Sequence, residues 1–255
     1  MTTDVDALDR QRRRWRNARR EFNMASETDE RFALAPPGTH VIDLGARIVV
    51  LPRDPVASVV EFDDAFWKWF SDPINDPASG KPARWGTDQT ASSSAAILFD
   101  PWSDGEWSRY LSVLHNGGID IGLGRNVVSR YEKGAVFNVS RIVARLWCGL
   151  QQFQRNLERF QLQGPFEVAV GLVNTSGAVL GGFGEGWSQS DWQPSCPTPN
   201  VLLRREIDDI CAGSTKALAF SLGGQVEDAF GCTSRRFLSR TGQFKDDFDP
   251  RYASW

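Results

Sequence analysis

A glycine-rich stretch, GGFGEGW at residues 181–187, is the first place in the sequence where chemistry can be sought. Four glycines among seven residues let backbone N–H groups approach an anion closely, as they do in nucleotide-binding loops. Such a loop needs a strand before the glycines and a helix after them. The residues that follow, 187–200, contain three prolines and have no helical period. The sequence therefore favours a closely packed strand end over a phosphate-binding loop.

Histidines and paired acids are the other candidates for catalysis. His40 and His115 stand beside no nucleophile motif such as G-x-S-x-G. Adjacent acids can hold magnesium for a nuclease or a phosphatase, although such pairs are more typical of a solvated surface. The pairs are Asp63–Asp64, Asp208–Asp209 and Asp246–Asp247. A metal-dependent nuclease or hydrolase therefore stays open as an alternative, with no catalytic residue, metal ligand or cofactor assigned.

An arginine-rich segment near the N-terminus is the main charged feature. Residues 1–22 carry seven arginines and four acidic residues, which gives this segment a net charge of +3 and leaves −6 on the remainder. Arginines on a helix can neutralise phosphates, and a tryptophan among them can stack on bases. The predicted nucleic-acid-binding residues are Arg12, Arg13, Arg16, Arg19 and Arg20. The alternative is a solvated helix that docks through Trp15 and Phe22.

Cysteine and apolar content indicate the cellular compartment. The four cysteines form no C-x-x-C pair, and this pattern, with only two histidines, argues against a zinc site. The N-terminus lacks the apolar stretch of a signal peptide, and no apolar run approaches the ~20 residues that span a bilayer. We expect a cytoplasmic protein with reduced thiols and no membrane contact.

Aromatic residues are numerous and mostly apolar, with ten tryptophans and sixteen phenylalanines against three tyrosines. Such a composition is typical of thick core layers or of an apolar surface for a partner. The residues predicted to bind a partner protein are Trp15, Phe22, Trp67, Trp69, Trp102 and Trp107.

The periodicity of apolar residues predicts the helices and strands that must position these residues. Alternation on either side of HNGG (115–118) predicts a β-hairpin over 107–124, and apolar residues every three or four positions predict a helix over 138–162. Further predictions are a second hairpin over 166–183, a strand or short helix start over 199–208, a helix over 214–231 capped by Ser214, an undecided aromatic element over 62–70, and a long irregular crossing over 72–94.

The predicted fold class is α+β, with antiparallel β-hairpins forming a sheet that is packed by two long amphipathic helices. A basic N-terminal helix is predicted over residues 1–25, a linker with Pro36-Pro37-Gly38 over 26–38, and a single domain over 39–255.

Several stretches carry a resemblance to a known family: RIVARLW (141–147), residues 164–187, PNVLLRREID (199–208) and RRFLSRTGQF (235–244). With the hairpin over 110–123, they resemble the C-terminal region of bacterial proteins that have an Alba-type, Schlafen-like DNA-binding domain at their N-terminus. Here a basic helix stands in place of that domain. The resemblance implies a free-standing accessory domain in a bacterial assembly, for phage defence or nucleic-acid regulation, and assigns no catalytic residue.

Together these observations predict a non-catalytic accessory subunit that binds another protein. Direct nucleic-acid binding by the arginine-rich helix is the first alternative, and metal-dependent hydrolysis is the second.

Overall fold

The structure is a computed structural model of the chain, and ten ranges of it are described. They are residues 45–52, 60–91, 95–101, 107–124, 127–131, 134–173, 175–181, 195–198, 200–232 and 237–245. The predicted basic helix over 1–25 and the linker over 26–38 lie outside these ranges and stay predictions.

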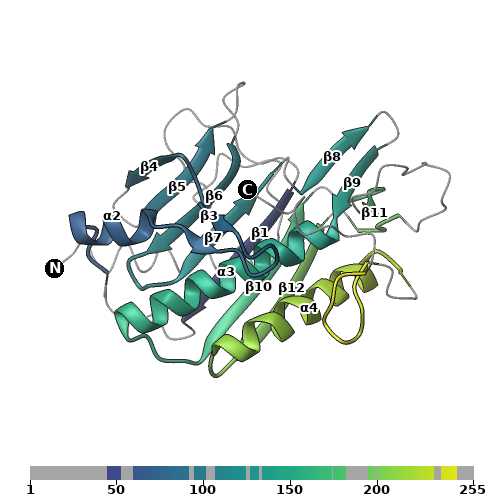
Figure 1. The fold of residues 1–255 in the computed structure, drawn as a ribbon. Coiled ribbons are helices and arrows are strands. Elements are labelled where there is room, and N and C mark those ends of the chain that lie inside the picture. The colour runs from purple at the N-terminus through teal and green to yellow at the C-terminus, as the bar shows by residue number, and fades with distance from the viewer. Residues whose placement is uncertain are drawn as a thin grey trace, which may run out of the picture.

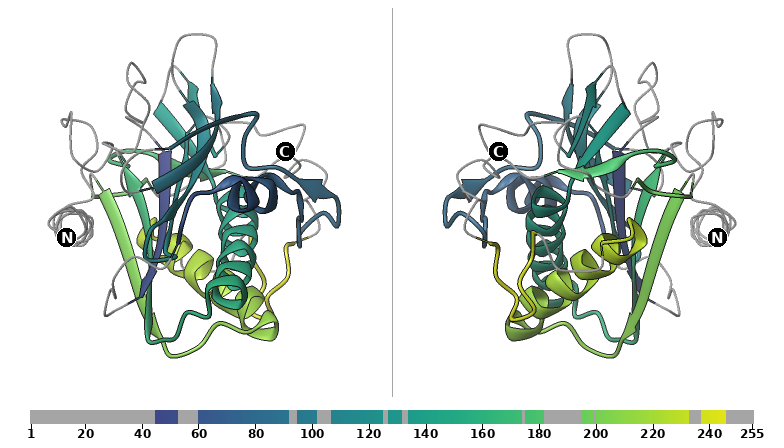
Figure 2. Two further views of the ribbon diagram at one scale, coloured as in Figure 1. Left: turned by 90° about the vertical axis from the view of Figure 1, so that its left-hand side faces the viewer. Right: turned by 90° about the vertical axis from the view of Figure 1, so that its right-hand side faces the viewer.

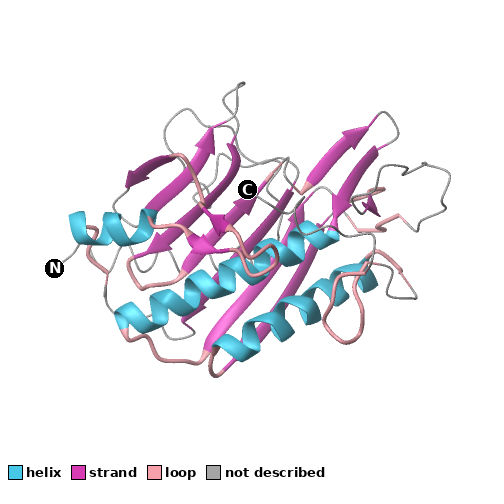
Figure 3. Cartoon of the chain, in the orientation of Figure 1, coloured by secondary structure: helices cyan, strands magenta, loops and turns pink. Residues whose placement is uncertain are grey.

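The body is a mixed α+β fold built on a seven-stranded antiparallel sheet (Figures 1 and 3), which confirms the predicted α+β class and its antiparallel sheet. Its strand order is β12-β10-β1-β7-β6-β5-β4. The bounds are β1 Gly45–Pro52, β4 Asp88–Ala91, β5 Ala95–Pro101, β6 Trp107–Leu114, β7 Ile119–Leu123, β10 Phe166–Val173 and β12 Asn200–Ile207. The hairpin predicted around HNGG is confirmed as β6–β7, and Asn200–Ile207 of the segment 199–208 forms strand β12.

Three helices of the described chain lie on one side of this sheet (Figure 2): α2 (Asp64–Ser71), α3 (Val139–Phe160) and α4 (Ala212–Ala229). The undecided element over 62–70 is helix α2, which begins because the Asp63 carboxylate accepts a hydrogen bond of 2.7 Å from the Phe66 N–H. Within the described ranges, no helix has both the length and the apolar composition that crossing a membrane requires.

Helix α4 starts earlier than the sequence predicted. Its N-cap is Cys211, and Ser214 lies inside the first turn, where its Oγ accepts a hydrogen bond of 3.1 Å from the Cys211 N–H. The serine hydroxyl thus accepts the backbone N–H of the N-cap residue, which has no partner within the helix, as in a capping box. The prediction of Ser214 as the cap is therefore wrong by one turn.

The second predicted hairpin, over 166–183, is also wrong. β10 pairs with β1 and β12, whereas β11 (Val179–Gly181) runs parallel to β9 (Gly134–Asn138). With β8 (Val128–Tyr131), these two strands form a separate three-stranded sheet, order β11-β9-β8. The predicted crossing over 72–94 contains a two-stranded sheet of β2 (Ile74–Asn75) and β3 (Pro82–Ala83), and also the edge strand β4.

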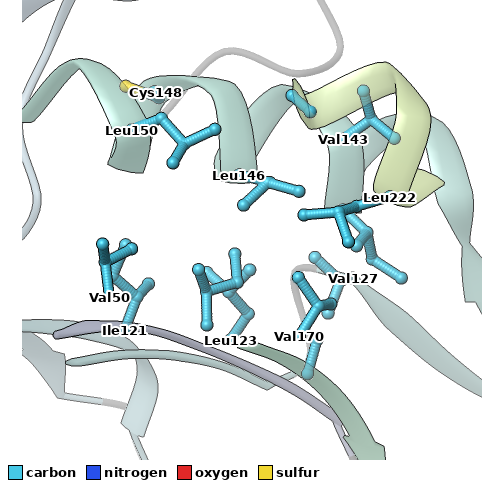
Figure 4. Close-up of a cluster of buried hydrophobic side chains, with 14 of the residues drawn as sticks. Val50, Ile121, Leu123, Val127, Val143, Leu146, Cys148, Leu150, Val170 and Leu222 are labelled. Carbon is cyan, nitrogen blue, oxygen red and sulfur yellow. The ribbon is translucent and has the colours of Figure 1, made fainter. Parts of the chain in front are cut away.

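The main core lies between the helices and the sheet. Figure 4 shows Leu146 and Leu150 of α3 pointing towards Val50, Ile121 and Leu123 of the strands below. Gly149 brings α3 close to the sheet, because an added Cβ would lie 2.5 Å from the Ile121 side chain. The predicted apolar face of α4 is confirmed by the burial of Leu218, Leu222, Val226 and Phe230.

The opposite face of the sheet is buried as well. Val49, Ile97, Tyr110 and Ala169 form a second apolar cluster there, each at most 5% exposed. We call this surface the second face. Its centre also holds a charged pair, Arg47 and Asp120.

Candidate functional site

The residues predicted to bind partners fall into two groups. Trp15, Phe22, Trp102 and the five arginines of the N-terminal segment lie outside the described residues, and Trp107 begins β6 with a side chain that is likewise outside them. Trp67 and Trp69 are described, and both lie in α2.

Helix α2 divides its aromatic residues between the core and the surface. Phe66 and Phe70 are each 1% exposed, whereas Trp67 and Trp69 are only half-buried against the core. We define the α2 surface as Trp67, Trp69 and the two α3 arginines beside Trp69, which are Arg155 and Arg159. The guanidinium carbons of these arginines lie 5.2 Å and 4.9 Å from the centroid of the Trp69 ring. This spacing is that of cation–π stacking.

Backbone and side-chain hydrogen bonds hold these arginines in place. Arg155 donates to the Trp69 carbonyl oxygen at 3.4 Å and to Gln152 Oε1 at 3.3 Å. Gln152 donates to Asn156 Oδ1 at 3.2 Å, and Asn156 donates to the Gly117 carbonyl oxygen at 2.9 Å. This chain of bonds runs from the surface to the β6–β7 turn, so the α2 surface is connected to the core.

A second group of arginines lies near the N-terminal half of α3. We define the arginine cluster as Arg109 of β6 with Arg141 and Arg145 of α3. Arg141 and Arg145 are four residues apart, which places them on one face of the helix. Asn156, near the end of α3, donates a hydrogen bond to Gly117 just before β7, and Gly149, earlier in α3, lies against Ile121 within β7. Helix α3 therefore runs antiparallel to β7. Arg145, one turn before Gly149, is at the level of the pair Arg109–Leu123, where β6 begins and β7 ends.

Two carboxylates accompany the arginine cluster. Arg109 forms an ion pair with Asp100 of β5. Asp76 is 1% exposed, and its carboxylate accepts hydrogen bonds from the Ala78 N–H at 2.9 Å and from the Ser79 hydroxyl at 2.8 Å. Asp76 is thus fixed by its own loop, and it acts on Arg145 through its charge.

Burial disfavours the charged forms of the arginines in the cluster. It lowers the pKa of Arg141 to about 10. Burial, together with the charge of Arg109, lowers the pKa of Arg145 to about 9, although Cys148 and Asp76 oppose this shift. Arg109 has a lowered pKa for the same reason, with Asp100 opposing. The two carboxylates near the cluster, Asp100 and Asp76, thus oppose the effect of burial on Arg109 and Arg145.

Cys148 lies beside the cluster on the side of α3 turned away from the strands (Figure 4). Its thiol is completely buried, and burial raises its pKa above the ordinary range. A thiol in this state is a poor nucleophile because the thiolate is the reactive form.

The other catalytic candidates have structural surroundings. Asp63 caps α2, Asp208 and Asp209 are exposed, and His115 stacks on Phe62 with ring centroids 4.2 Å apart. Within the described ranges, no group of three His, Cys, Asp or Glu side chains is arranged to hold a metal ion.

Sequence reasoning missed the arginine cluster. A signal existed in the helix over 138–162, where Arg141 and Arg145 interrupt the apolar pattern at four-residue spacing. Arg109 is on a strand more than thirty residues away, so the grouping arises only in the folded chain.

Comparisons with protein-family models, curated proteins and solved structures find no match to this chain.

Proposed function

We propose that this protein is a non-catalytic accessory subunit that binds another protein through the α2 surface. The observation that carries the proposal is the half-exposed position of Trp67 and Trp69 on a helix whose phenylalanines are buried. Tryptophan and arginine are the residue types that contribute most to binding energy at protein interfaces.

Fixed geometry adds to this argument. Arg155 and Arg159 lie on the Trp69 ring, and Arg155 is bonded to a backbone carbonyl and to Gln152. Side chains already ordered in the unbound protein lose less conformational entropy when a partner binds. A partner with apolar side chains flanked by carboxylates fits such a surface, because tryptophan supplies the apolar contact and arginine pairs with the carboxylates.

The resemblance suggests the setting. An accessory domain in a bacterial phage-defence or nucleic-acid regulatory assembly would leave the reaction to another chain. The basic segment over residues 1–25 would serve as a tether, with Trp15 and Phe22 as its anchors.

The test is copurification of a tagged full chain from its native host, followed by Trp67→Gln and Trp69→Gln. We expect the double variant to lose the partner that the wild-type protein retains, with at least a tenfold weaker affinity in a direct binding assay. Trp147→Gln is the matched control, because Trp147 is also half-buried but packs beside Phe220 and Lys216 between α3 and α4. A wild-type protein that is monodisperse and alone in the host extract would contradict the proposal.

Nucleic-acid binding is the first alternative function, and the arginines of residues 10–20 favour it. Deleting residues 1–22 would then abolish a salt-sensitive gel shift with a DNA duplex or RNA. Unchanged binding after the deletion would rule out this alternative.

Metal-dependent hydrolysis is the second alternative. It predicts divalent-ion-dependent cleavage of nucleic acid that Asp208→Ala removes, and the absence of cleavage with magnesium and manganese would count against it.

A further inference from the structure

We propose that two copies of this chain associate through strand β12, so that their two seven-stranded sheets join into one continuous sheet. The inference rests on the length and exposure of β12, on its regular pairing with β10, and on a sequence that is complementary to itself. It is independent of the α2 surface, which is built from other elements.

Strand β12 is one of the two edges of the sheet, and β4 is the other (Figure 1). Within the described ranges, no strand pairs with the side of β12 that is turned away from β10. Every second residue of an edge strand directs its backbone N–H and C=O groups outwards, where they can bond to another strand. The sheet can therefore be extended at β12.

The two edges differ in how well they can accept a further strand. β4 has four residues, whereas β12 has eight, contains no proline and pairs with β10 residue for residue without a bulge. Short strands, prolines and bulges are the features that commonly protect an edge from pairing. Only Val201 of the eight β12 residues is buried. β12 is thus the edge that favours pairing.

The side chains of β12 alternate between the two faces of the sheet. Arg205 donates to the Ser221 hydroxyl of α4 at 3.1 Å, so the odd-numbered residues face the helices. The even-numbered residues lie on the second face, where Leu202 packs against the apolar cluster. Arg204 lies 3.7 Å from the Glu167 carboxylate there, and its side chain is 48% exposed. Arg204 can therefore reach a carboxylate on an added strand.

Two identical strands can pair antiparallel only in certain registers. Residues directly opposite one another must both direct their backbone groups towards the partner strand or both away from it. That direction alternates along a strand, so the twofold axis must pass through a residue and not between two residues. Opposed side chains then share a face, and the helices of both copies lie on the same side of the joined sheet.

An axis through Arg205 gives the most favourable side-chain pairs. It places Arg204 opposite Glu206 of the second copy and Leu203 opposite Ile207 of the second copy, and each pair occurs twice. Opposite charges, and apolar side chains, stabilise an antiparallel pair when they are directly opposed. An axis through Arg204 or through Glu206 would instead oppose like charges. The sequence of β12 therefore selects the register centred on Arg205.

This register has one unfavourable contact, because it opposes Arg205 to itself across the axis. Glu206 has contacts within its own chain, but a carboxylate accepts through two oxygens and can also pair with Arg204 of the second copy. A single strand pair buries less surface than the ~1,600 Å² of a standard interface. We therefore expect a reversible dimer with a dissociation constant in the micromolar range.

The experiment follows the mass of the full chain by sedimentation equilibrium over a range of protein concentrations. Arg204→Glu opposes two pairs of acids and should weaken the dimer by about tenfold, and Glu206→Arg added to it should restore the dimer. Arg205→Gln removes the like-charge contact at the axis and should strengthen the dimer. Arg240→Glu makes the same charge change at an exposed position outside β12, and this control should dimerise as the wild type does.

Crosslinking tests the register itself, in a Cys211→Ser background that removes the exposed cysteine. Directly opposed Cα atoms lie about 4.5–5.5 Å apart, so Arg205→Cys should form an interchain disulfide on oxidation with diamide. Arg204→Cys is the matched control, because its two copies would be offset along the strands by more than the ~7 Å that a disulfide spans. A monomer at all concentrations, a dimer that Arg204→Glu leaves unchanged, or equal crosslinking of the two cysteine variants would overturn the proposal.

Discussion

Two arginines, Arg47 on the second face and Arg145 in the cluster, are each 3% exposed, yet their charges are balanced in different ways. Arg47 forms two hydrogen bonds to the Asp120 carboxylate, one of them 2.8 Å from Nε to Oδ1. The Tyr110 hydroxyl donates to the same Asp120 Oδ1 at 3.3 Å. Arg145 instead shares its surroundings with Arg109 and Arg141, and the charge of Arg109 adds to the effect of burial.

The difference lies in the charges that surround each guanidinium. Arg47 is matched to one carboxylate by two hydrogen bonds, so removing either partner leaves a buried charge. Arg145 has both arginines and Asp76 near it, and their charges act on its pKa in opposite directions. The same residue type at the same burial therefore has different roles on the two faces of the sheet.

Breaking the Arg47 pair should have the largest effect. Arg47→Met leaves Asp120 charged and buried, and we expect the free energy of unfolding to fall by about 3–5 kcal/mol. Urea denaturation measures the change. Asp120→Leu added to Arg47→Met removes the stranded charge and should restore at least half of the loss; no recovery in the double variant would show that the pair is not the cause.

The packing around this pair gives the next largest effect. The Tyr110 ring covers Gly122, so that an added Cβ would lie 2.0 Å from a ring carbon. Gly122→Ala should cost about 1–3 kcal/mol by overpacking. Gly213→Ala is the matched control, because a Cβ there meets nothing within 4 Å and alanine favours the helix. Equal stability of the two variants by urea denaturation would contradict the described contact.

Arg145→Met should have a much smaller effect than Arg47→Met, within about 1 kcal/mol of the wild type, because it relieves repulsion as well as removing attraction. The measurement is again the free energy of unfolding. If Arg145→Met were as damaging as Arg47→Met, the contrast between the two sites would disappear.

Thiol reactivity should distinguish the buried Cys148, beside the arginine cluster, from the exposed Cys211. This measurement requires no substitution that changes stability. Burial raises the pKa of Cys148, whereas hydrogen bonds to Ser214 lower the pKa of the exposed Cys211. Iodoacetamide at neutral pH should modify Cys211 in the folded protein, and Cys148 only after unfolding. Peptide mapping by mass spectrometry gives the sites, and Cys211→Ser serves as control. Early labelling of Cys148 would show that the cluster side of α3 is open.

Local patterns predicted the elements whose partners are close in sequence. The Asn-Gly turn determines the β6–β7 hairpin, and sustained periodicity identifies α3, because both signals lie within the segment itself. The 166–183 hairpin was wrong although its turn composition was suitable. Strand β10 finds β1 and β12 instead, and such long-range pairing leaves no mark in the turn. Helix α2, with eight residues, is too short for its period to be distinguished from a strand.

The candidate sites likewise differ in whether local sequence or long-range packing determines them. Trp67 and Trp69 could be selected by residue type alone, since aromatic residues dominate both cores and interfaces. The arginine cluster could not, because it depends on the antiparallel arrangement of α3 and β7 and on the position of β6. The contact between Phe244 and Ala144 likewise joins residues a hundred positions apart.

The contrast between the two arginine sites is tested most directly by a double-mutant cycle in the full chain. It combines Arg47→Met with Asp120→Leu, with the free energy of unfolding as the measured quantity. We expect a coupling energy of at least about 1 kcal/mol, because the two side chains share two hydrogen bonds. Strictly additive effects would contradict the account, because they would mean that Arg47 and Asp120 do not stabilise the fold as a pair.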